Sequence, residues 1–85
     1  MIASSEGVKA IILEVVDNQL KDNTPPETRQ TYQRLLKQGF SKDEARELIG
    51  AVVSSEIFEV LKKQEPYDQK RFIAALHKLP KMPWE

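Results

Sequence analysis

The stretch GFSKDE in the middle of the chain constrains the fold most, because it ends one helix and starts the next. Gly39 is typical of the position just after a helix. Ser41 and Glu44 fit a capping box, in which each side chain binds the backbone N–H of the other residue. Phe40 precedes this cap and is placed to pack on Ala45 as a hydrophobic staple. The sequence therefore predicts two helices joined at a tight corner.

A second start signal lies upstream, in the stretch NTPPE. Thr24 is the expected N-cap, and Pro25 then takes the first helical position, where its missing N–H has no cost. Glu27 stands three residues after Thr24, the spacing of another capping box. These residues predict the start of the helix that ends at Gly39.

The last helix is bounded by the stretch EPYD and by Pro80. Asp68 is the expected N-cap, because its carboxylate can accept a hydrogen bond from the first helical turn. Tyr67 before the cap and Phe72 after it are spaced for a second hydrophobic staple. Pro80 lacks a backbone N–H and stops the helix.

Apolar residues recur at helical spacing in four segments, at about residues 5–22, 25–38, 42–64 and 69–79. The first begins at Ser4 or Ser5 as cap. Its stretch AIILEVV also suits a strand, but the chain holds no second strand to pair with it. The residues expected to face inward are Val8, Ile11, Ile12, Val15, Val16, Leu20, Thr28, Tyr32, Leu35, Leu36, Ala45, Leu48, Ile49, Val52, Val53, Ile57, Val60, Leu61, Phe72, Ile73, Leu76 and Leu79.

These segments predict an all-α fold, a compact bundle of four helices joined by short connections. With 85 residues, we expect a single helical domain over residues 1–85. The third helix is the longest, and we expect it to be central. Gly50 lies within it at a cost of up to about 1 kcal/mol relative to alanine, which a close helix crossing would explain.

Composition excludes several classes of protein. The chain has no cysteine, which excludes disulfides, thiolate metal sites and cysteine nucleophiles. Its formal net charge is zero, whereas a nucleic-acid binder usually carries a basic excess. No apolar run approaches the ~20 residues of a membrane span, and the first residues carry no basic leader. We expect a cytoplasmic protein without a nucleic-acid or membrane partner.

Catalytic motifs are absent from the sequence, and we expect no enzyme activity and no cofactor. His77 is the only histidine, at the edge of an apolar face, where we expect a solvent-edge or packing role and not that of a general base. Neither a glycine-rich phosphate loop nor an HExxH motif occurs. Carboxylates outside the apolar stripes fit a solvated face beside Lys42 and Arg46: Glu14, Asp17, Asp43, Glu44 and Glu47.

Two polar residues, Gln19 and Glu56, interrupt apolar faces. Glu56 allows three interpretations. It lies near a rim and reaches water; or it forms a structural hydrogen bond to Gln19, to the Tyr32 hydroxyl or to a backbone cap; or it marks a ligand pocket or a catalytic acid. Burial without a partner would raise the pKa of the Glu56 carboxyl.

The corner at residues 35–49 also invites comparison with two recognition motifs. A helix-turn-helix would place Lys42, Asp43, Glu44, Arg46 and Glu47 against DNA, and three acids against two bases would be repelled by phosphate. The corner is also similar to the Leu-x-x-Met-Gly-Phe corner of ubiquitin-associated-type modules. Gln38 replaces the methionine, however, and the following apolar stripe runs on without the turn that those modules need.

A broader resemblance covers residues 14–62. The segments VDNQ, NTPPE, TYQRL, GFSKDEA and EIF resemble a family of small bacterial helical proteins of unknown function. The resemblance places Gln19 and Glu56 within the family pattern. It also implies histidines at three positions that here hold Leu13, Asp43 and Glu47, so that a metal site built on them would be lost or altered in this chain.

We expect a non-catalytic protein that acts through protein–protein contacts or self-association. A chain this short can bury more apolar surface as a dimer. Phe58 and Trp84 are the candidate interaction surface, since Phe58 points away from the main stripe and Trp84 either folds back or lies exposed. The alternative is a metal- or small-ligand-binding protein, using Gln19 and Glu56 or the clustered carboxylates.

Overall fold

The computed structural model describes residues 5–85, with side chains from residue 7 onward. These residues form four α-helices and no strand: α1 (Ser5–Asp22), α2 (Pro26–Lys37), α3 (Lys42–Lys63) and α4 (Gln69–Lys78). The predicted all-α four-helix fold is confirmed, and the expected helix ends are met within one residue. The predicted Ser4 or Ser5 cap lies outside the described side chains. None of the helices in residues 5–85 is long and apolar enough to cross a membrane.

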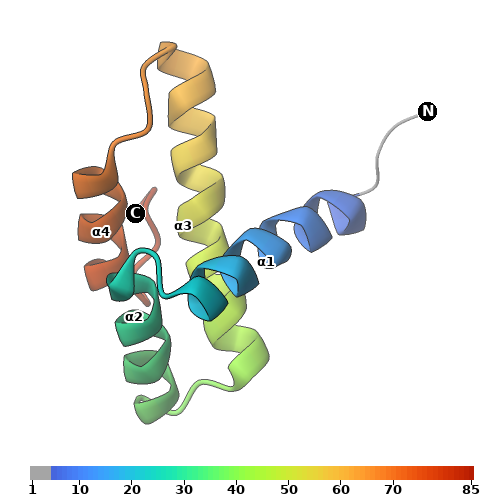
Figure 1. Ribbon diagram of the computed structural model, residues 1–85, viewed down its shortest axis with the longest axis vertical. Coiled ribbons are helices and arrows are strands. Elements are labelled where there is room, and N and C mark those ends of the chain that lie inside the picture. Colours follow the sequence, from blue (N-terminus) through green and yellow to red (C-terminus); the bar gives the residue numbers. More distant parts are fainter. Residues whose placement is uncertain (1–4) are drawn as a thin grey trace.

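Helix α3 is the centre of the molecule and contacts the other three helices. Figure 1 shows α2 and α4 following one another along one side of α3, while α1 crosses α3 near its middle. The crossing is close at Gly50, where an added Cβ would lie 3.2 Å from Ile12 Cγ2. The glycine therefore lets α1 approach the α3 backbone, as the sequence predicts.

The corner between α2 and α3 has the predicted chemistry. Gly39 takes a left-handed φ of 101°, and its N–H donates to the Leu36 carbonyl while the Phe40 N–H donates to the Leu35 carbonyl. This pair of bonds is the Schellman ending of a helix. Ser41 then caps α3 in a reciprocal capping box with Glu44. The backbone groups at the end of α2 and at the start of α3 are therefore hydrogen-bonded by partners that lie within six residues in the sequence.

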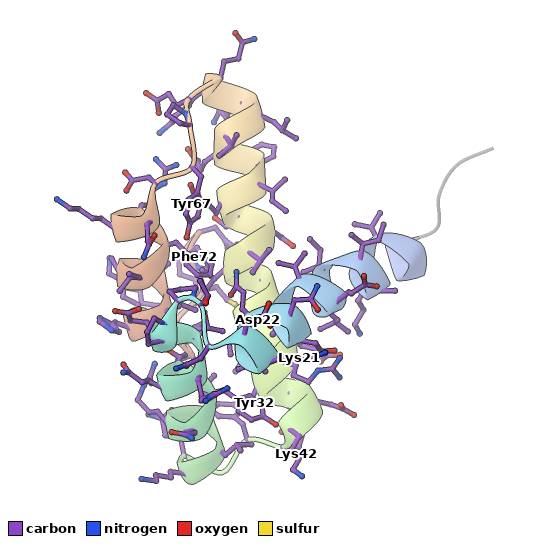
Figure 2. All side chains as sticks on the ribbon, viewed as in Figure 1. Lys21, Asp22, Tyr32, Lys42, Tyr67 and Phe72 are labelled. Atoms are coloured by element: carbon purple, nitrogen blue, oxygen red, sulfur yellow. The ribbon has the colours of Figure 1, made fainter. Side chains whose placement is uncertain are left out.

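The start of α4 is also as predicted. The Asp68 carboxylate accepts a hydrogen bond of 3.1 Å from the Arg71 backbone N–H. The rings of Tyr67 and Phe72 pack with centroids 6.0 Å apart. Figure 2 shows both rings between α4 and α3. The connection from α3 is thereby held against the bundle.

The predicted capping of α2 by Thr24 is wrong. Pro25 occupies the N-cap position, no side chain caps the helix, and α2 begins at Pro26. The Thr24 hydroxyl instead donates to the Asp22 carbonyl at 3.0 Å, and the Thr24 N–H donates to the Gln19 carbonyl. Thr24 therefore closes the end of α1, because its polar groups turn back to the carbonyls left free there.

The core draws on all four helices and on Leu79 just after α4. Thr31 is buried as well, without having been expected. Four residues predicted to face inward are exposed instead: Val8, Ile11, Ile57 and Leu61. The reason is tertiary. Because α1 crosses α3 rather than lying along it, the first half of α1 and the last turns of α3 extend away from each other (Figure 1).

Candidate functional site

Glu56 lies on the inner side of α3 with 6% of its surface exposed. Its carboxylate accepts two hydrogen bonds from the Arg71 guanidinium, from Nε at 2.8 Å and from Nη2 at 2.7 Å. A third comes from the Asp68 backbone N–H at 3.1 Å. A bidentate arginine pair of this kind is among the strongest hydrogen-bonded arrangements in proteins. Glu56 therefore ties α3 to the first turn of α4 instead of reaching water.

The electrostatics of Glu56 follow from this partner. The hydrogen bonds from Arg71 lower the pKa of the Glu56 carboxyl below its ordinary value, and they outweigh burial, which acts in the opposite direction. The same pairing raises the pKa of Arg71. Glu56 is therefore a carboxylate at neutral pH, and it is not poised to take up a proton.

Gln19 has a different partner. Its side-chain oxygen accepts a hydrogen bond of 2.9 Å from the hydroxyl of the buried Thr28 on α2. No hydrogen bond joins Gln19 to Glu56 among the described residues. The two nevertheless line the same hollow, so the structure brings them to one place without pairing them.

This hollow, which we call the α1–α3 cleft, has a volume of about 350 Å³. It lies between the second half of α1, the second half of α3 and the connection to α4. Apart from Gln19 and Glu56 its lining is apolar or aromatic: Val15, Val53, Ile57, Val60, Leu61, Tyr67 and Phe72. Burial, followed by the charges of Glu56 and Asp68, raises the pKa of the Tyr67 phenol. At neutral pH the lining therefore offers apolar contact and no group free to exchange a proton.

Further apolar residues of α1 are exposed outside the α1–α3 cleft. Val8 and Ile11 precede Val15 on α1 at spacings of seven and four residues, so all three lie on one helix face. Ile11 is 65% exposed, and Leu61, on the opposite side of the cleft, is 72% exposed. Exposed apolar residues that stand singly are ordinary, whereas large contiguous apolar patches mark interaction sites.

The clustered carboxylates form hydrogen bonds and ion pairs with other residues of the chain. Glu44 completes the α3 capping box, Asp43 pairs with Arg46 at 3.3 Å, and Glu47 pairs with Lys9 at 2.6 Å. Asp17 also accepts two hydrogen bonds from Arg46. Among the described residues no group of three or more histidine, aspartate or glutamate side chains is placed to hold a metal ion.

The predicted contact residues Phe58 and Trp84, and also His77, do not line the α1–α3 cleft. Phe58 is exposed on α3, and the Lys62 ammonium lies 5.7 Å from its ring centroid. Trp84 is 68% exposed near the chain end, so it does not fold into the core. His77 is exposed on α4.

Sequence reasoning missed Arg71 as the partner of Glu56, and it missed the α1–α3 cleft itself. A signal for the cleft was available in the helix lengths. At 1.5 Å per residue, the 22-residue α3 is much longer than the 12-residue α2 or the 10-residue α4. A long unbroken apolar stripe on such a helix can extend past the shorter helices beside it, and its end is then left uncovered.

Comparison with family models, with curated proteins and with solved structures finds no match. The case for a function therefore depends on the geometry of this chain.

Proposed function

We propose that the protein is a non-catalytic, cytoplasmic binding module that takes an apolar helix of a protein partner into the α1–α3 cleft. The observation that carries this proposal is the lining of the cleft, which is apolar or aromatic except for Gln19 and Glu56, together with the exposed apolar side chains of Ile11 and Leu61. Helix-in-groove recognition uses such a surface, in which apolar side chains at helical spacing enter a groove between helices.

The polar groups of the cleft support binding rather than chemistry. Glu56 is held by Arg71 and by the Asp68 backbone, and the Gln19 oxygen is held by Thr28. Their hydrogen bonds fix the floor of the cleft in one shape. The Gln19 amide nitrogen has no acceptor among the described residues and is available to a backbone carbonyl of the partner.

Site-specific photo-crosslinking in cells tests the proposal. A photoreactive amino acid is placed at Leu61, in the cleft, and in a matched chain at the exposed Gln33 of α2. We expect a discrete protein adduct from position 61 and none from position 33. Substituting Ile57→Glu in the chain that carries the photoreactive residue should abolish the adduct, because a charge in the cleft lining disfavours an apolar helix. Absence of any protein adduct at position 61 contradicts the proposal.

The volume of the α1–α3 cleft favours a second candidate, the binding of a small apolar ligand. About 350 Å³ lies within the usual range for small-molecule sites. Native mass spectrometry of the purified protein distinguishes this candidate, which predicts an added mass of a few hundred daltons that Ile57→Glu removes. A protein at its bare chain mass, without stabilisation by divalent metals in a thermal-shift assay, argues against ligand and metal binding together.

A further inference from the structure

We infer that the helix taken into the α1–α3 cleft is α1 of a second copy of this chain, with each copy filling the cleft of the other. This inference rests on the proposed function and names its partner. The α1 face formed by the exposed Val8 and Ile11 and the half-buried Val15 supplies the apolar side chains, and the partner's cleft receives them between α3 and the connection to α4.

The first argument is the exposure of α1 itself. Its first turns extend beyond α3 in Figure 1, and Val8 and Ile11 are both more than half exposed. A helix in water is stabilised chiefly by packing of its apolar face, and a few unpacked turns are marginal alone. A second molecule that covers this face would give Val8 and Ile11 apolar contacts.

The second argument is complementarity of charge. Val8, Ile11 and Val15 are uncharged, the exposed Glu14 stands beside Ile11 at the edge of this face, and the one carboxylate of the cleft is neutralised by Arg71. A charged partner would lose its hydration in the cleft without finding a counter-ion. The face of α1 is apolar, so it fits the chemistry of the cleft.

The third argument is symmetry. In a two-fold dimer one patch meets itself, so the patch must contain both a projecting and a receiving part. Here both parts lie on one surface, because Val15 belongs to the α1 face and also lines the α1–α3 cleft. A two-fold axis near Val15 would run the two α1 helices antiparallel, and each Ile11 would lie against Ile57 and Leu61 of the other copy.

The buried area suits a reversible dimer. Val8, Ile11, Ile57, Leu61 and Tyr67 are each about half exposed or more. Together they present on the order of 200–400 Å² of apolar surface. A two-fold interface buries this patch on both copies. If a little under half of the interface is polar, as is usual, the total area buried by the two copies is about 700–1,300 Å². This is the lower end of specific interfaces, so we expect a dimer that dissociates on dilution.

Analytical ultracentrifugation of the full chain, from micromolar to millimolar concentration, is the first test. We expect a monomer–dimer equilibrium for the wild type. Ile11→Lys on the projecting face and Leu61→Glu in the cleft should each raise the dimer dissociation constant at least tenfold. Both positions are mostly exposed in the monomer, so circular dichroism should show unchanged helicity. Gln33→Lys, on the exposed face of α2, is the matched control and should leave the dissociation constant unchanged.

Mixing the two variants tests the reciprocal geometry. In a mixed dimer, Lys at position 11 of one copy meets Glu at position 61 of the other, while the second contact keeps Ile11 against Leu61. We therefore expect an equimolar mixture of Ile11→Lys and Leu61→Glu to recover a dimer that neither variant forms alone. A contact between like surfaces, α1 face on α1 face only, gives no such recovery and overturns the arrangement.

The inference and the proposed function fail in different ways. A wild type that stays monomeric at millimolar concentration overturns the second copy as partner. If the photo-crosslink at position 61 then yields another protein, the proposed function still stands. A dimer that both variants leave intact overturns the cleft as the interface. A self-adduct at position 61 that Ile11→Lys abolishes supports both.

Discussion

Single side chains in this molecule join helices that follow one another in the chain. Glu56 and Arg71 are fifteen residues apart, yet their ion pair fixes the angle between α3 and α4 at the inner end of the α1–α3 cleft. Gln19 and Thr28 do the same for α1 and α2. The polar residues that interrupt the apolar faces are therefore connections between helices, and they give the cleft a fixed shape.

The ion pair predicts a pH dependence of stability. Because the pKa of Glu56 is lowered in the folded state, its contribution is complete above the unfolded pKa of ~4.3 and is lost as the pH falls through the folded value. We expect Glu56→Gln to lower the free energy of unfolding by about 1–2 kcal/mol at pH 7. The difference from wild type should shrink below about pH 4. Urea unfolding followed by circular dichroism at pH 7 and pH 3 measures both.

Glu14→Gln is the matched control for this pH profile, since Glu14 is an exposed glutamate on α1. It should leave the profile of the wild type unchanged. An equal loss of stability in Glu56→Gln at pH 7 and pH 3 would show that shape, and not charge, carries the contribution of Glu56.

Gly50 predicts a graded response to side-chain size. In Gly50→Ala the new Cβ meets Ile12 Cγ2 at 3.2 Å, and this crowding is offset by a gain of up to about 1 kcal/mol in helix propensity. We therefore expect a change within about 1 kcal/mol. Gly50→Leu should lower the free energy of unfolding by about 1–3 kcal/mol, because the larger side chain forces α1 off α3. Thermal or urea unfolding measures the series, and equal stability of the two variants would argue against a close crossing.

At the scale of the element, helix ends differ in which groups hydrogen-bond their free backbone N–H and C=O groups. Substitution at Ser41 and at Thr24 measures the difference in stability. Ser41→Ala removes the hydroxyl that accepts from Glu44 N–H, so it should lower the free energy of unfolding by about 1 kcal/mol. Thr24→Ala removes only a hydroxyl donor at the exposed end of α1 and should cost less than about 0.5 kcal/mol. Chemical unfolding of both variants measures these free energies. A larger loss of stability in Thr24→Ala than in Ser41→Ala would indicate that Thr24 caps α2 after all.

The features that could be predicted from the sequence are those determined by residues close together in the chain. The Ser41 box, the Asp68 cap and the turn at Gly39 involve residues within a few positions, and each formed as expected. The predicted N-cap role of Thr24 was wrong because two helix ends lie within a few residues of it. The sequence pattern alone does not say which of them its hydroxyl will bond.

The candidate site was harder to predict because its causes are tertiary. Periodicity assigns Ile11 and Leu61 to apolar faces but not to a covering element, and the crossing of α1 over α3 leaves both exposed. Glu56 was singled out by its place on an apolar face, whereas Arg71 belongs to a different helix and has no spacing relation to it. A pattern can thus mark an unusual residue without naming its partner.

At the scale of the whole molecule, the fold is made of a packed half and an open half. The packed half holds α2, α4, the second half of α1 with Val16, and α3 as far as Val53, where the buried apolar residues gather. The open half consists of the first turns of α1 and the last turns of α3. The close contact of α1 and α3 at Gly50 belongs to the core, and other residues of both helices line the α1–α3 cleft.

This division predicts how the stability of the molecule depends on concentration. If association fills the open half, the folded state is favoured by mass action, and the unfolding temperature rises with protein concentration. We expect a rise of several degrees between 5 µM and 500 µM for the wild type and none for Leu61→Glu. The double variant Phe58→Ser, Trp84→Ser should behave as the wild type, because both side chains lie outside the cleft. If this double variant loses the concentration dependence while Leu61→Glu retains it, the association surface is the one that Phe58 and Trp84 define.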